Sequence, residues 1–263
     1  MIDIHAHVLP TVDDGPADIK EAIEAIEQLA REGVTEIVAT PHFNDRYPHV
    51  PASELLARVR ALQRIAEHRN LPVRLFAGHE IRLARDTADM LASGTAATIN
   101  DGPYVLIELP SGDFPADLAA TITSLRTSGF IPVLSHVERY RPTIANPDVL
   151  VPLVEAGAIM QVTASSIVGS FGEQVRETTE ILLRRNLAHV FGSDVHALPI
   201  RQPYFSVGIK RAAAIVGSQR IREMTTVMPS AILYGDPVEL PPVLAPAEVR
   251  HYGFRIRRQS TDG

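Results

Sequence analysis

Residues 1–15 read MIDIHAHVLPTVDDG, an apolar start that is followed by His5, His7, Asp13 and Asp14. A flexible terminus is the usual expectation for the first positions of a chain, and it would not need this combination. In a β-strand, residues two apart project to the same side, so a His-x-His pair lets both imidazoles bind one metal ion. The segment therefore predicts a first strand that leads directly into a metal site.

The rest of the chain alternates between short apolar runs and amphipathic segments, a pattern typical of βα units and a largely parallel sheet. Gly33 suits the end of the first helix, whose apolar face comprises Ile19, Ala22, Ile23, Ile26 and Leu29. The predicted strands are residues 1–5, 35–40, 73–78, 104–109, 131–136, 158–163 and 187–193. The predicted helices are residues 15–33, 52–70, 117–129, 146–157 and 173–186.

These strands recur at intervals of roughly 25 to 35 residues, which favours a (β/α) barrel over an open sheet. We expect one domain over residues 1–235, because no flexible linker interrupts it. From Asp236 the pattern fails, and residues 236–263 form a tail that is first rich in proline and then in arginine. The arginines are Arg250, Arg255, Arg257 and Arg258. A partly ordered tail is the simpler interpretation, and an arm that contacts a partner subunit or an acidic surface is the alternative.

Composition narrows the class of protein. The chain has 263 residues, 45% of them hydrophobic, and a formal net charge of -6. An acidic protein lacks the basic face that general nucleic-acid binding requires. No run approaches the roughly 20 apolar residues of a membrane-spanning helix, and no signal-peptide pattern follows Met1, so we expect a cytoplasmic protein with no membrane insertion. The absence of cysteine excludes thiolate catalysis and disulfide scaffolds.

Titratable side chains fall where the predicted strands end. In a βα barrel the carboxyl ends of all strands meet at one face, so these side chains should surround a single cleft. The nine candidates are His5, His7, Asp14, His42, Glu80, Glu108, His136, Asp194 and His196. The pair Asp194-x-His196 repeats the geometry of His5-x-His7. The chemistry of the side chains alone does not choose between Asp13 and Asp14.

A single histidine beside a strand is more often structural than a ligand, so the prediction depends on the whole set. His79 should point away from the cleft if its neighbour Glu80 points inward. The other histidines, in positions typical of loops, a helix surface, a strand start and the tail, are His49, His68, His189 and His251.

Imidazoles and carboxylates without sulfur suit divalent Mn, Fe or Zn. Nine ligands are too many for one ion, and a carboxylate can bridge two, so two or three ions are expected. Four carboxylates against three divalent ions leave a net charge of about +2, which would attract an anionic substrate and lower the pKa of a bridging water. This balance favours phosphoester hydrolysis.

The nine-residue set resembles the metal signature of the PHP (polymerase and histidinol phosphatase) superfamily. The stretches MIDIHAH, VDDG, ATPH, YVLIELP, PVLSHVERY and GSDVH are more closely similar to the bacterial manganese-dependent protein tyrosine phosphatases of capsule and exopolysaccharide operons. The likeness runs from Met1 to about residue 235. It implies a distorted (β/α)7 barrel that holds three metal ions, and manganese is the expected metal.

The resemblance also implies the roles of individual residues. It selects Asp14 over Asp13, and it places phosphate-binding arginines at Arg139 and Arg201, whose planar guanidinium groups suit phosphate oxygens. The implied ligand groups are His5, His7, Glu80 and Asp194 for one ion, Glu80, Glu108 and His136 for a second, and Asp14, His42 and His196 for the third.

The implied activity is a phosphoric monoester hydrolase that acts on phosphotyrosine, on the tail of a bacterial tyrosine kinase. The mechanism would be in-line attack by a metal-activated water, without a covalent phosphoenzyme. Such a target requires an open, shallow groove. Thr163, where relatives often carry Asn, and residues 43–49 (FNDRYPH) depart from the family pattern and should shape the substrate mouth.

Three other functions compete with this hypothesis. A histidinol-phosphate phosphatase would use the same fold and chemistry on a small metabolite, although VDDG and HVERY count against it. A PHP exonuclease or polymerase-associated module conflicts with the acidic charge. A noncatalytic scaffold that binds a kinase would tolerate the loss of His5 and Asp194. The oligomeric state and the acid that protonates the leaving group are not predicted by the sequence.

Overall fold

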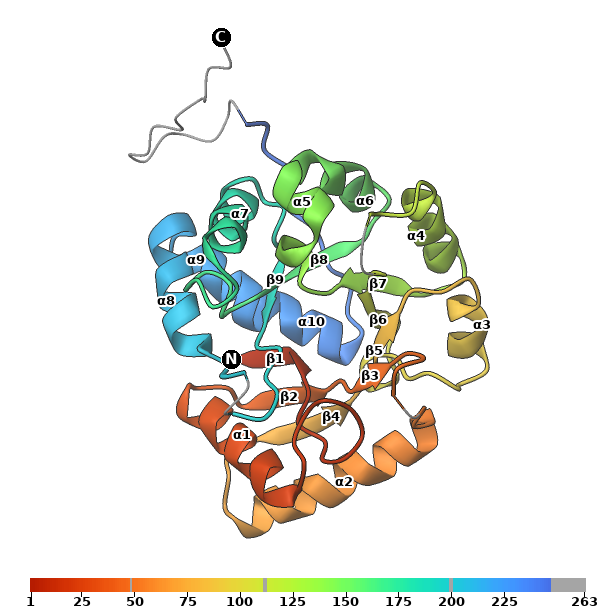
Figure 1. The fold of residues 1–263 in the computed structure, drawn as a ribbon, viewed down its shortest axis with the longest axis vertical. Helices are drawn as coiled ribbons and strands as arrows, with labels where there is room; N and C mark the ends of the chain where they lie inside the picture. The colour runs from red at the N-terminus through yellow and green to blue at the C-terminus, as the bar shows by residue number, and fades with distance from the viewer. Residues whose placement is uncertain (48, 111–112, 199–200, 247–263) are drawn as a thin grey trace.

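The computed structural model describes residues 1–47, 49–110, 113–198 and 201–246, and a ring of helices surrounds a parallel sheet (Figure 1). The strands are β1 (Ile2–Ala6), β2 (Glu36–Ala39), β3 (His42–Phe43), β4 (Arg74–Ala77), β5 (Glu80–Arg82), β6 (Tyr104–Glu108), β7 (Ile131–Leu134), β8 (Ile159–Thr163) and β9 (Val190–Gly192).

The α-helices are α1 (Ile19–Arg31), α2 (Ala52–His68), α3 (Thr87–Ala92), α4 (Leu118–Thr127), α5 (Arg141–Ala145), α6 (Val151–Glu155), α7 (Glu173–Arg184), α8 (Phe205–Val216), α9 (Ser218–Arg222) and α10 (Met228–Tyr234). Three 3₁₀ segments, η1 (Ile99–Asp101), η2 (Val137–Arg139) and η3 (Pro147–Leu150), and the π-helix η4 (Glu223–Val227) complete the described elements. No helix in the described ranges is both long and apolar enough to cross a bilayer.

The curled sheet consists of two hydrogen-bonded parts, and the second part continues the strands of the first. One part has the order β1-β2-β4, and the other has the order β3-β5-β6-β7-β8-β9, with every pair parallel. The pairing of β3 with β5 keeps the same register as the pairing of β2 with β4. A bridge between Ala6 and Val195 brings the ends of β1 and β9 together. The predicted α/β class with a largely parallel sheet is therefore confirmed, and the sheet is curled.

Two apolar clusters cover the two faces of this sheet. The outer cluster joins sheet residues such as Ile37 and Ile107 to the surrounding helices, for example through Ile26 of α1 and Leu182 of α7. The inner cluster combines alternate strand residues with side chains of α10, which lies across the centre of the ring in Figure 1. Its members are Ile2, Ile4, Val38, Ile99, Tyr104, Leu106, Val133, Ile159, Val190, Met228, Ile232 and Leu233.

An irregularity in β1 positions the first two histidines. Ile2 and Asp3 pair with Glu36 and Ile37, but Ala6 pairs with Ala39, so β1 contains one residue more than its partner. Such a β-bulge changes which residues face inward. Ile4 can therefore join the inner cluster, while the next residue, His5, still lies in the polar group above it.

Most predicted elements are confirmed, with differences at their ends. The predicted helix at 146–157 is η3 followed by α6, and β3, β5, α3, α5 and α8 to α10 were not predicted. Ile19 is 51% exposed, so its expected place on the buried face of α1 is wrong. It is the first residue of the helix, directly after the capping residue Asp18, whose side chain accepts a hydrogen bond from Glu21 N. Gly33 has φ +89°, as expected for a residue that follows a helix.

The first part of the predicted tail packs against the body of the protein. Leu244 N donates to Arg185 O at 3.0 Å, and Val238 and Leu240 contact the inner cluster. The arginine-rich part of the tail, with His251, lies outside the described residues.

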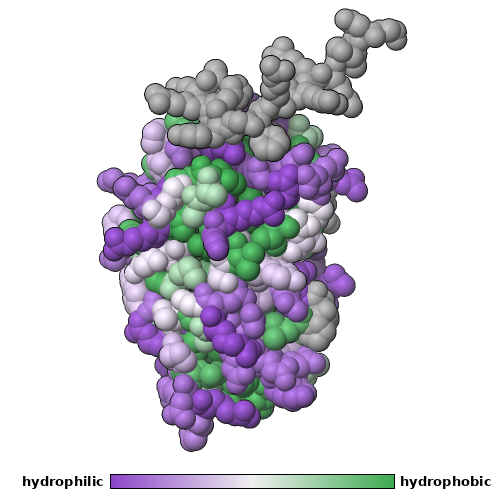
Figure 2. All heavy atoms as spheres, turned by 90° about the vertical axis from the view of Figure 1, so that its left-hand side faces the viewer, coloured by the Kyte–Doolittle hydropathy of each residue, from purple (hydrophilic) through white to green (hydrophobic). Residues whose placement is uncertain are grey.

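Figure 2 shows the face on the side of α8 and α9, where hydrophobic residues are separated by hydrophilic ones.

Candidate metal centre

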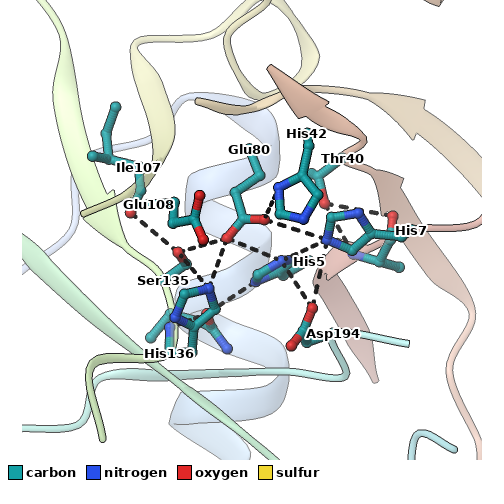
Figure 3. Close-up of polar contacts among 12 residues, drawn as sticks. His5, His7, Thr40, His42, Glu80, Ile107, Glu108, Ser135, His136 and Asp194 are labelled. Atoms are coloured by element: carbon teal, nitrogen blue, oxygen red, sulfur yellow. Dashed lines mark hydrogen bonds and ion pairs between the residues drawn. The ribbon is translucent and has the colours of Figure 1, made fainter. Parts of the chain in front are cut away.

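All nine predicted ligands lie in the described part of the chain, and the structure gathers them at the carboxyl ends of the strands. Figure 3 shows the carboxylate of Glu80 between the rings of His5, His7, His42 and His136. Within the described residues, three groups bring one ligand atom of each member within 4.8 Å of the others. The groups are His7, Asp14, His42 and His196; His5, His7 and Glu80; and Glu80, Glu108 and His136.

Glu80 is the centre of this arrangement. One oxygen, Oε1, lies 2.9 Å from His136 Nε2 and 3.5 Å from His5 Nε2. The other, Oε2, lies 3.0 Å from His42 Nδ1 and 3.4 Å from His7 Nε2. The side chain is fully buried. A carboxylate with both oxygens directed at different imidazoles has the geometry to bridge two cations.

Asp14 closes the arrangement on its more open side. Asp14 Oδ1 lies 3.3 Å from His196 Nε2 and 3.5 Å from His42 Nε2, and its side chain is 43% exposed. The ring of Tyr47 stacks on His42 at 5.4 Å, with 6° between the planes. Tyr47 belongs to the segment that was expected to shape the substrate mouth, and its ring borders the site. Thr163, the other departure from the family pattern, is fully buried, so it does not reach the surface of the mouth.

Asp194 connects the imidazoles to the two predicted arginines. Its Oδ1 lies 3.4 Å from His5 Nε2 and 3.5 Å from His7 Nε2. Its Oδ2 accepts hydrogen bonds from Arg139 Nη2 at 2.6 Å and from Arg201 Nη1 at 2.9 Å. Both guanidinium groups thus lie at the edge of the candidate metal centre.

Two polar side chains fix the tautomers of His5 and His7. Gln161 Oε1 accepts from the backbone N–H of His136 at 2.8 Å, so His5 Nδ1, at 3.1 Å from the same oxygen, must be the donor of its pair. Asp13 Oδ2 accepts from His42 N and lies 2.7 Å from His7 Nδ1. In the neutral rings both Nε2 atoms therefore present lone pairs, as metal-binding imidazoles do.

These two lone pairs face each other at 3.1 Å. Two acceptors at that distance repel each other unless a cation or a proton lies between them. Among the described residues, Glu108 Oε2 is also buried without a hydrogen-bond partner, and Glu80 Oε2 and His42 Nδ1, although 3.0 Å apart, form no hydrogen bond with each other or with another group. Buried polar atoms are rarely left unpaired, and this donor set of nitrogen and carboxylate oxygen suits divalent cations.

The electrostatics of the centre keep two of its buried carboxylates, Glu80 and Asp194, charged. Burial alone would raise the pKa of Glu80, but the imidazoles of His5, His136 and His42 hold it well below its usual range. Burial also opposes ionisation of Asp194, and Arg139, His5 and Arg201 outweigh it, so this pKa is also well below its usual range. Carboxylates that stay ionised inside the protein need cations nearby.

The backbone takes an uncommon conformation at two of the candidate ligands. His136 has φ +37° and Asp194 has φ +50°, values that are uncommon for residues other than glycine. Alternation along β7 would direct Ser135 inward and His136 outward, and the left-handed turn brings His136 into the site as well. Gly192 is the last residue of β9. A Cβ atom on this residue would lie only 2.8 Å from His5 Cβ and from Gln161 Nε2, so a larger residue would displace these side chains.

Several residues of the site were not predicted. Ser135 Oγ donates to Glu80 Oε1 at 2.7 Å, and Gln161 and Asp13 hold the two histidines. Inward alternation along β7 and β8 is the sequence signal that could have found Ser135 and Gln161. His79 was correctly separated from the set, because its Nδ1 accepts from Ala97 N and its ring packs on Phe43.

Comparison with known proteins agrees with this picture. Similar proteins include the putative tyrosine-protein phosphatase CapC of Staphylococcus aureus, which is 38% identical over 202 residues (76% of this chain, 79% of the relative). Tyrosine-protein phosphatase YwqE of Bacillus subtilis is 37% identical over 202 residues, with the same coverage.

A solved structure described as YwqE from Bacillus subtilis and CpsB from Streptococcus pneumoniae, unique metal-dependent tyrosine phosphatases, has a TM-score of 0.89 and 31% identity. The match covers 93% of this chain and 98% of that chain. The profile of the family "Capsular polysaccharide synthesis, CpsB/CapC" matches residues 1–234. These matches confirm the resemblance inferred from the motifs, and the chain belongs to the CpsB/CapC family of capsular polysaccharide synthesis.

Proposed function

We propose that this protein is a divalent-metal-dependent phosphatase that hydrolyses phosphotyrosine on a protein of capsule or exopolysaccharide synthesis. The observation that carries the proposal is the joint arrangement of the three imidazole–carboxylate groups and the two arginines around Asp194. Relatives named as tyrosine-protein phosphatases support the same reaction. The chain has no cysteine, so a phosphocysteine intermediate is impossible.

We infer that two or three divalent ions bind, with manganese preferred over iron or zinc. His5, His7, Glu80 and Asp194 would hold one ion, Glu80, Glu108 and His136 a second, and Asp14, His42 and His196 a third. When bound, such ions stabilise developing negative charge and lower the pKa of a coordinated water toward neutrality.

The protein's own residues would orient the substrate. Arg139 and Arg201 present planar N–H donors that match the oxygens of a phosphoryl group, and the substrate would enter beside Asp194. Asp13, Gln161 and Ser135 would hold the ligands in place through the hydrogen bonds described above. No residue is assigned to protonate the phenolate.

The scaffold and partner follow from the same reasoning. We infer a distorted (β/α)7 barrel over residues 1–235, in which β2 with β3 and β4 with β5 each count as one interrupted strand, followed by a tail over residues 236–263 whose first part packs against the barrel. We infer that the substrate is the tyrosine-rich tail of a bacterial kinase, met in the cytoplasm.

Metal removal tests the reaction. The protein is treated with a chelator, its metal content is measured, and hydrolysis of a phosphotyrosine peptide is followed before and after Mn²⁺ is restored. We expect activity to disappear with the metal and to return with it, and His136→Ala to lose both. A metal-stripped sample that keeps full turnover would falsify the proposal.

A substrate panel separates the proposal from its competitors. The metal-loaded protein is offered the phosphotyrosine peptide, the same peptide with phosphoserine, histidinol phosphate and single-stranded DNA. The phosphotyrosine peptide should have the highest kcat/KM. Preferred turnover of histidinol phosphate, or nuclease activity, would assign the same site to another substrate class.

A further inference from the structure

Phe171 lies across both arginines of the site. Arg139 Cζ is 4.6 Å from the centre of its ring, and Arg201 Cζ is 5.9 Å from the same centre. The two arginines also share Asp194 Oδ2 as acceptor. One aromatic ring and one carboxylate oxygen thus hold two guanidinium groups that come from different segments of the chain.

The loop that carries Phe171 is fixed beside Arg139. Phe171 lies between β8 and α7, and its side chain is half-buried. Glu138, the neighbour of Arg139 in η2, accepts hydrogen bonds from Thr163 N at 3.0 Å and from Ser166 Oγ at 2.6 Å. These bonds join the start of the loop to η2, so the place of the ring over Arg139 is part of the fold.

This arrangement suits phosphate binding. A guanidinium group donates its hydrogen bonds in its own plane, and an aromatic ring is attracted to its face. Both Cζ atoms lie over the ring of Phe171, and a ring that meets the face of a guanidinium group leaves its in-plane donors to phosphate oxygens. Phe171 restricts the motion of two long side chains, which would otherwise lose rotamer freedom when the phosphate binds.

We propose that Phe171 is a positioning residue that orients Arg139 and Arg201 for the phosphoryl group of the substrate. The proposal rests on the proposed function and adds a residue to it. Phe171 contacts the arginines and acts through them, so its loss should weaken phosphate binding and leave the metal ions in place.

The test compares Phe171→Leu, which keeps an apolar side chain without a π face, with Phe171→Trp, which keeps the face. Four quantities are measured for the metal-loaded protein: the affinity for inorganic phosphate by calorimetry, the KM and the kcat for a phosphotyrosine peptide, and the metal content. We expect Phe171→Leu to weaken phosphate binding and raise KM about fivefold to tenfold with unchanged metal content. Phe171→Trp should stay within about twofold of the unmodified protein.

Phe76 supplies a matched control, because it is also partly buried and has Arg74 Cζ 5.7 Å from its ring centre. Arg74 pairs with Glu36 and Tyr234, away from the site, so Phe76→Leu should leave phosphate affinity unchanged. Thermal unfolding reports whether each variant folds. Should Phe171→Leu not fold, Phe171→Met, which also lacks a π face, replaces it with the same expected result and the same contradicting outcomes.

The outcomes separate the two proposals. Unchanged phosphate affinity in Phe171→Leu, an equal loss in Phe171→Trp, or loss of metal in Phe171→Leu would each overturn the role of Phe171. A protein that binds phosphate with the expected dependence on Phe171 but does not hydrolyse the peptide would overturn the proposed function alone. Absence of phosphate binding in the unmodified protein would contradict both.

Discussion

Buried histidines behave differently at the two ends of the sheet. His189, just before β9, uses both ring nitrogens on the backbone, since Nδ1 accepts from Met160 N at 2.9 Å and Nε2 lies 3.0 Å from Asn186 O. At the other end, His42 leaves Nδ1 without a hydrogen-bond partner, and His5 and His7 direct their Nε2 atoms at each other. Backbone partners at both ring nitrogens, more than burial, distinguish His189 from the candidate ligands His5, His7 and His42.

The same contrast holds for charge. Burial, with a smaller effect from Arg220, lowers the pKa of His189 to about 3, so this ring is neutral near pH 7. In the candidate metal centre, Glu80 and Asp194 keep their charge inside the protein because imidazoles and guanidinium groups face them. His189 thus has partners for both ring nitrogens without any added ion, whereas the candidate metal centre has a donor set that cations would complete.

Loss of the central carboxylate should have the largest effect. Glu80→Gln keeps the size of the side chain and removes the negative charge of a carboxylate that belongs to two of the three ligand groups. We expect kcat/KM for a phosphotyrosine peptide to fall on the order of 10³ and the bound metal to decrease. Glu67→Gln, on the exposed face of α2, is the control. Retention of metal and turnover in Glu80→Gln would remove the basis for treating this end as a metal centre.

The arginines should affect the substrate more than the metal. Arg139→Lys and Arg201→Lys keep a positive charge beside Asp194 and lose the planar fork. We expect kcat/KM to fall about 10²-fold in each, with the metal content unchanged. Arg58→Lys on α2 provides a control at an exposed ion pair. Steady-state kinetics with metal analysis measures both effects, and wild-type kinetics in both variants would exclude these arginines from phosphate binding.

The tautomer of His7 offers a subtler test of the same end. Asp13→Asn replaces the acceptor at His7 Nδ1 with an amide that can donate, so the ring can present the wrong nitrogen to an ion. We expect metal affinity, measured by competition with a fluorescent chelator, to fall about 10-fold to 100-fold. Asp86→Asn, an exposed position, is the matched control. Equal affinities in the two variants would mean that Asp13 does not orient His7.

The gathering of the nine candidates was predictable because it depends on a general property of parallel sheets. Each candidate follows or ends a strand, and the carboxyl ends of parallel strands share one edge. The sequence alone therefore brings together residues as distant as His5 and Asp194. The identity of the occupying ions and the role of each ligand stay predictions.

Other features depend on contacts that the local pattern does not contain. The extra residue in β1 places Ile4 in the inner cluster and the next residue, His5, in the candidate metal centre. It appears only in the pairing of β1 with β2. The left-handed turn at His136 reverses the alternation of β7. Phe171 is an ordinary loop residue in the sequence, and only the fold places two arginines on its ring. Helix α10 was missed because its apolar residues, such as Ile232, face an inner cluster contributed by distant strands.

The smallest predicted effect concerns the end without the metal centre. His189→Asn removes two backbone hydrogen bonds, so the metal-free variant should be less stable by about 1 kcal/mol at pH 8. In the unmodified protein, unfolding exposes His189 to its ordinary pKa near 6.5, while the folded ring resists protonation down to about pH 3. Its contribution is therefore present above pH 6.5 and decreases as the pH falls below it, so the gap between the two proteins should close with acid. Urea unfolding from pH 8 to pH 4 measures that gap, with His68→Asn on the exposed end of α2 as control. A gap that stays constant over this range would mean that His189 takes up its proton as readily in the folded as in the unfolded protein, and that the contrast between the two ends does not extend to charge.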